Sequence, residues 1–117
     1  MRKGSWAVGP VGAEADLAVT VFPGDVGGRL ANINRWRGQL GLPDATAEVY
    51  AVKNPAKVGR LQGERVDLRS SDGTTATCAI LVEHQNATWF FKLTGPSSTV
   101  DSASPELMSF LGATELP

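Results

Sequence analysis

Residues 24–42 read GDVGGRLANINRWRGQLGL, and this stretch predicts a glycine-rich loop that leads into an amphipathic helix. Asp25 occupies the position of an N-cap, Gly41 suits the residue just past the helix end, and Pro43 stops the helix. The apolar residues at helical spacing are Val26, Leu30, Ile33 and Leu40, and either Trp36 or Arg37 fills the position between Ile33 and Leu40. We therefore expect Ile33, Trp36 and Leu40 to pack this helix onto a sheet near Phe22 and residues 89–93.

Alternating apolar residues on both sides of this helix predict strands. Two strands are expected over residues 3–8 and 16–22, and a hairpin at residues 9–14 joins them. Further strands are expected over residues 57–69, 74–83 and 88–94, with turns at residues 70–73 and 85–87. Residues 44–51 fit a short helix or a turn.

A final helix is expected to begin at Ser104, with this residue as N-cap and Pro105 in the first helical position. Glu106 would then lie at the positive helix end, Leu107, Phe110 and Leu111 would form one apolar face, and Gly112 would close the helix. The element order is β-β-α-(α)-β-β-β-α. It predicts an α+β fold in which an antiparallel sheet packs against two main helices.

Length and composition indicate one domain over residues 1–117 and set limits on its partners. The chain has 117 residues, is 42% hydrophobic and carries a net charge of −1. Without a basic excess we expect no nucleic-acid partner. The longest clean apolar run is residues 79–82, so no membrane span is expected. As written, the chain shows no export signal, and the sequence does not indicate an oligomeric state or a compartment.

Several strings resemble a family of uncharacterised bacterial domains: MRKGSW at residues 1–6, PGDVGG at 23–28, NINRWRGQLGL at 32–42 and WFFKLTG at 89–95. The element order resembles the PsbP/Mog1-like α/β/α sandwich. The resemblance implies an exported or lipid-anchored protein of the envelope or periplasm, without an established activity. It also implies a Trp-containing segment before the Met-Arg pair, so that Met1 would be a truncated or misassigned start. It supplies no catalytic residue.

The helix at residues 24–42 carries the best candidates for a binding site, namely Asn32, Asn34, Arg35, Arg37 and Gln39. On a helix, Asn32, Arg35 and Gln39 lie on one face. One interpretation is an exposed recognition stripe, since Arg and Trp are common in interface hot spots. The other is a solvated face with Asn and Arg side chains bonded to loop carbonyls.

Other motifs are weaker. Gly27 and Gly28 precede a helix, where free N–H groups bind anions, but the phosphate-loop Lys is absent and Asp25 would repel phosphate. His84 and Cys78 share one face of a predicted strand about 20 Å apart, too far for a nucleophile pair. With one His and one Cys, no zinc site, metal or cofactor is expected. Residues 86–88 match a glycosylation acceptor in a turn.

Two classes of function remain open from the sequence. The first is a non-catalytic binding or accessory domain of the bacterial envelope, whose partner is an unidentified protein or envelope component. The alternative is a small ligand-binding domain or enzyme with a pocket between the first helix and the sheet. A flat polar helix face favours the first, whereas a pocket lined by convergent polar groups favours the second.

Overall fold

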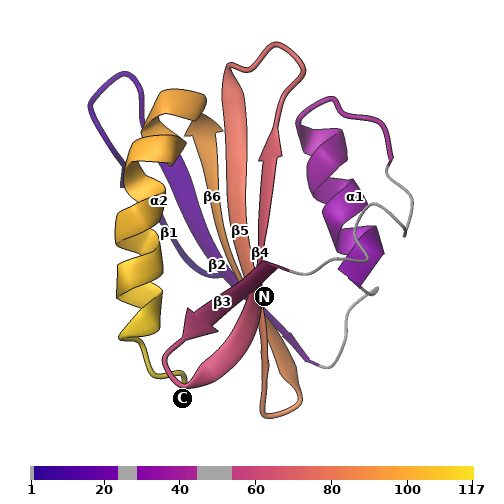
Figure 1. Ribbon diagram of the computed structural model, residues 1–117, viewed down its shortest axis with the longest axis vertical. Coiled ribbons are helices and arrows are strands. Elements are labelled where there is room, and N and C mark those ends of the chain that lie inside the picture. The colour runs from indigo at the N-terminus through magenta and orange to yellow at the C-terminus, as the bar shows by residue number, and fades with distance from the viewer. Residues whose placement is uncertain (1, 24–28, 45–53) are drawn as a thin grey trace.

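The strands of this chain form one antiparallel sheet, and the two helices lie on opposite faces of it (Figure 1). The computed structural model describes residues 2–23, 29–44 and 54–117. The sheet order is β1-β2-β6-β5-β4-β3. The elements are β1 (Arg2–Val8), β2 (Ala15–Pro23), α1 (Arg29–Gln39), β3 (Asn54–Val58), β4 (Leu61–Arg69), β5 (Thr75–His84), β6 (Ala87–Pro96) and α2 (Ser97–Gly112).

This arrangement confirms the α+β fold with an antiparallel sheet and two main helices. In Figure 1, α2 and α1 stand on either side of the strands, so the molecule has a helix-sheet-helix layering. Strands β5 and β6 are central, as the apolar residues on both faces of 74–83 indicate. No helix in the described segments is long and apolar enough to cross a membrane.

The face of the sheet toward α2 holds the larger core. Successive residues of a strand point to opposite faces, so Cys78, Ile80 and Val82 of β5 share this face with Phe91 and Leu93 of β6. The buried residues of this core are Ala15, Val58, Ala76, Cys78, Ile80, Val82, Phe91, Leu93, Val100, Leu107 and Leu111. Helix α2 supplies the last three and closes the core.

The face toward α1 holds a smaller core built around Trp36. Ile33 and Trp36 are 0% and 2% exposed, and they pack with Val66, Leu68, Ala79 and Phe90. The Trp36 ring meets the Phe90 ring edge-on, with centroids 5.7 Å apart and planes at 86°. Leu40 and Phe22 lie against the same cluster. The expected packing of Ile33, Trp36 and Leu40 is confirmed.

The C-terminal end of α1 also follows the sequence prediction. Gly41 adopts a left-handed backbone with φ of 72°, which a residue without Cβ tolerates. The Leu42 N–H donates to the Arg37 carbonyl at 2.9 Å, which closes the last turn. Asp25, Gly27, Gly28 and nearly all of the element expected at 44–51 lie outside the described residues.

The strand expected over 57–69 is two strands, and that prediction was wrong. Strand β3 ends at Val58, and β4 returns from Leu61 beside it. Gly59 makes the turn with φ of 59°, and its N–H donates to the Leu111 carbonyl at 2.8 Å. Because Gly59 and Arg60 lie between apolar residues, the sequence alone did not reveal the break.

The last helix begins at Ser97 and not at Ser104, so Pro105 lies inside it. Ser104 is therefore no N-cap, and Glu106 is not at the helix start. Pro105 has no N–H for the Asp101 carbonyl, and the Ser104 hydroxyl approaches that carbonyl at 3.5 Å instead. The helix start is tied to the β4–β5 turn, because the Ser97 hydroxyl donates to the Gly73 carbonyl at 2.6 Å.

Truncating Trp36 tests whether the smaller core holds the fold. We expect Trp36→Ala to lower the free energy of unfolding by about 3–5 kcal/mol, because it leaves a cavity beneath α1. Phe110→Ala is the matched control, since Phe110 is 64% exposed and its loss should cost less than about 1 kcal/mol. Urea unfolding measures both values, and equal losses would contradict the placement of Trp36.

A second pair of variants tests the turn between β3 and β4. Gly59 and Gly73 both have positive φ, but only at Gly59 would a Cβ collide with the backbone carbonyl of Thr114. Gly59→Ala should therefore cost about 1–3 kcal/mol more than Gly73→Ala in thermal or urea unfolding. If both substitutions cost the same, the C-terminal segment does not pack against this turn.

Candidate functional site

An open pocket lies between α1 and the part of the sheet formed by β2 and β6. Its volume is about 440 Å³, within the range of small-molecule sites. The lining residues come from three elements that are far apart in sequence. They are Ala18, Thr20 and Phe22 of β2, Arg35, Trp36 and Gln39 of α1, and Phe90 and Lys92 of β6.

The sheet register explains why there is room for this pocket. On the α1 face, Ala18 stands opposite Lys92, and Thr20 stands opposite Phe90. The two β2 side chains are small, so the surface beside α1 is hollow above them. Phe22 lies next to Phe90 with ring centroids 5.8 Å apart. The aromatic rings of Phe22 and Phe90 therefore form the floor of the pocket, and Phe90 also packs against Trp36.

The rim of the pocket is polar and positively charged. Arg35 and Gln39 are four residues apart and emerge on one side of α1, where both are exposed. The Lys92 ammonium donates a hydrogen bond to Gln39 Oε1 at 2.9 Å, which joins the sheet to the helix. The lining contains two cations and no carboxylate. This arrangement favours an anionic group with an apolar body.

Of the five residues expected to form a binding site, the structure brings Arg35 and Gln39 to this pocket. Asn32 is 5% exposed, so the prediction of one exposed stripe through Asn32, Arg35 and Gln39 was wrong. Asn32 precedes Trp36 by one helical turn and is buried as Trp36 is. The Arg37 Nε donates to the Pro43 carbonyl at 2.7 Å, a bond that holds the chain after α1. Asn34 is half-buried.

Sequence reasoning missed Lys92, which completes the rim. The strand at 88–94 was expected, and alternation alone places Phe90 and Lys92 on one face and Phe91 and Leu93 on the other. Lys92 is thus a charged residue on a face that packs against a helix. A charged residue on a strand face that packs against a helix was the signal in the sequence that could have indicated a site beside α1.

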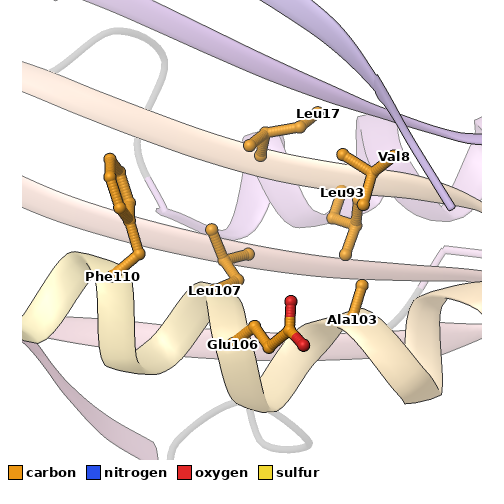
Figure 2. Close-up of a pocket in the computed structure, with 7 residues that line it drawn as sticks. All are labelled: Val8, Leu17, Leu93, Ala103, Glu106, Leu107 and Phe110. Atoms are coloured by element: carbon orange, nitrogen blue, oxygen red, sulfur yellow. The ribbon is translucent and has the colours of Figure 1, made fainter.

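A second, apolar pocket lies on the opposite face, between α2 and the β1–β2 side of the sheet (Figure 2). Its volume is about 290 Å³, and Val8, Leu17, Leu93, Ala103, Glu106, Leu107 and Phe110 line it. Phe110 was expected on the apolar face of the last helix together with Leu107 and Leu111. The latter two are buried, but Phe110 is 64% exposed, because it lies over this pocket and not in the core.

Cys78 and His84 do not form a reactive pair in this geometry. Both lie on the α2 face of β5, which is regularly paired over its length and holds them about 20 Å apart. Burial raises the pKa of the Cys78 thiol to about 12. His84 Nε2 is buried without a hydrogen-bond partner among the described residues. The described segments contain no group of three His, Cys, Asp or Glu side chains suited to a metal.

Comparison with known proteins identifies a shared fold. No protein-family model matches the sequence, and no curated protein matches it. Among solved structures, the chain is similar to the crystal structure of PA94, a protein of unknown function from Pseudomonas aeruginosa. The match covers 97% of this chain and 81% of PA94, with 9% sequence identity and a TM-score of 0.52. This likeness shows the fold alone.

The state of Cys78 gives a prediction for thiol chemistry. A pKa of about 12 keeps the folded thiol neutral up to pH values well above 9, and the thiolate is the form that reacts. We expect iodoacetamide at pH 8 to leave Cys78 unlabelled in the folded protein and to alkylate it fully in urea, as measured by intact mass. Rapid labelling of the folded protein would contradict the burial of this side chain.

Proposed function

We propose that this chain is a non-catalytic binding domain and that the pocket beside α1 holds a carboxylate attached to an apolar or aromatic group. The observation that carries this proposal is the convergence of Arg35, Gln39 and Lys92 above an aromatic floor. These side chains come from a helix and a strand, and the bond between Lys92 and Gln39 fixes their relative position.

The chemistry of each part supports the same ligand class. A guanidinium presents N–H donors in a planar fork that matches a carboxylate, so Arg35 supplies directional recognition. Lys92 adds positive charge, and Phe22 and Phe90 offer apolar surface beneath it. A ligand with a carboxylate at one end and an apolar body can contact both regions at once.

The lining also favours binding over catalysis. It includes no His, Cys, Asp or Glu side chain, so a bound group meets donors and apolar walls without an acid–base pair. We further propose that the chain belongs to the family of uncharacterised bacterial domains that its sequence resembles, with the PsbP/Mog1-like sandwich that its element order resembles. If the chain is an accessory domain of the envelope, the carboxylate that the pocket binds would belong to a partner protein or to an envelope component.

The proposal predicts that binding depends on charge and on Arg35. 3-Phenylpropionate should bind at the pocket more tightly than 3-phenylpropanol, which has the same body without the charge. Arg35→Gln should weaken 3-phenylpropionate binding about tenfold, because a charge-assisted hydrogen bond contributes about 1.5–3 kcal/mol. Isothermal titration calorimetry gives the affinities, and thermal melting checks that the fold is kept.

Arg60→Gln is the matched control. Arg60 is an exposed arginine in the β3–β4 turn, so this substitution removes the same charge at a site away from the pocket. This variant should bind 3-phenylpropionate as the unaltered protein does. Equal binding of the acid and the alcohol, or equal losses in the two variants, would show that the rim does not recognise a carboxylate. A large fall in melting temperature with Arg35→Gln would mean that Arg35 is a structural residue.

A further inference from the structure

The apolar pocket on the α2 face has the features of a second, separate binding site. Its walls are the side chains of Val8 on β1, Leu17 on β2 and Leu93 on β6, with Ala103 and Leu107 of α2 on the other side. Ala103 and Leu107 are one helical turn apart, and the small Ala103 leaves space between α2 and the strands. Figure 2 shows these side chains turned toward one another across the gap.

One charged side chain borders this pocket. Glu106 is exposed and projects from α2 between Ala103 and Leu107 (Figure 2). The described residues offer its carboxylate no ion pair. The other acid of α2, Asp101, is neutralised by Arg69, whose Nη2 lies 2.8 Å from Asp101 Oδ1. Helix α2 contains no basic residue, and Glu106 is the one charged side chain among the residues that line the pocket.

Exposed aromatic rings lie on the same side of the molecule. The Phe110 ring rises from α2 toward the strands in Figure 2, although Phe110 is 64% exposed. Trp6 is 54% exposed and stands opposite Leu17 on β1, on the same face of the sheet. Its ring lies over Gly4, since a Cβ at residue 4 would be 2.6 Å from Trp6 Cη2. Trp6 and Phe110 thus add exposed aromatic surface to the face of the sheet that carries the apolar pocket, and Phe110 is part of its lining.

We propose that this pocket binds an organic cation, with the apolar chain between α2 and the strands and the ammonium group at Glu106. The carboxylate supplies the opposite charge, and the face of the Phe110 ring attracts a cation through its quadrupole. Protonated alkylamines and quaternary ammonium ions share this chemistry. The site is independent of the pocket beside α1, which has the opposite charge and lies on the other face of the sheet.

Three probes with the same alkyl chain test this proposal in the full chain. Hexyltrimethylammonium should bind saturably and shift the methyl NMR signals of Val8, Leu17, Leu93 and Leu107. Hexanol should bind about threefold more weakly and hexanesulfonate about tenfold more weakly, since the first lacks the charge and the second reverses it. Glu106→Gln should weaken hexyltrimethylammonium binding about twofold, so that its preference over hexanol falls but is not lost, because the Phe110 ring still attracts the cation.

Glu83→Gln is the matched control, because Glu83 is an exposed acid on β5 and does not line the pocket. It should leave the affinity for hexyltrimethylammonium unchanged. The proposal is overturned if none of the probes gives saturable shifts at these methyl groups. It is also overturned if the cation and the sulfonate bind equally, or if Glu83→Gln and Glu106→Gln have the same effect.

Discussion

The edge-on contact between Trp36 and Phe90 is the constraint on which the α1 side of this molecule depends. The described part of α1 has 11 residues, and helices of this length are marginal in isolation. It also contains Gly38 and two asparagines, which lower helix propensity. The helix is therefore held by its contacts with the sheet, and Trp36 and Ile33 make the most completely buried of them.

The same contact sets the geometry of the binding pocket. Arg35 precedes Trp36 by one residue, and Gln39 follows it by three. The position in which the indole ring packs therefore determines where these two side chains lie relative to the sheet. Phe90 precedes Lys92 by two residues on β6, so both point to the α1 face. A shift of Trp36 relative to Phe90 would change the distance between Gln39 and Lys92. The apolar packing and the polar rim are thus parts of one arrangement.

The sequence predicted those features that depend on local signals. Alternation identified β1, β2, β5 and β6, helical spacing identified Ile33, Trp36 and Leu40, and Gly41 marked the end of α1. The expected site residues Arg35 and Gln39 do line a pocket, whereas Lys92 was missed, although alternation places it on the same face of β6 as Phe90. The break at Gly59 and the helical start at Ser97 also depend on tertiary contacts, with Leu111 and Gly73 respectively.

Asn32 and Phe110 show that residue type alone does not predict burial on a helix. Polarity suggested that Asn32 is exposed, and hydrophobicity suggested that Phe110 is buried, yet the structure has the reverse. Helical spacing assigns a face to each residue but does not say how far the sheet extends beneath that face. Asn32 is buried one helical turn before Trp36, whereas Phe110 is exposed and lines the apolar pocket.

A double-mutant cycle on Trp36 and Phe90 tests the central claim most directly. The free energy of unfolding would be measured for the unaltered protein, Trp36→Leu, Phe90→Leu and the double variant. Our account predicts a coupling of about 0.5–1.5 kcal/mol between the two sites, as found for aromatic pairs in contact. Additive effects, within about 0.3 kcal/mol, would contradict it and would mean that α1 is seated by other contacts.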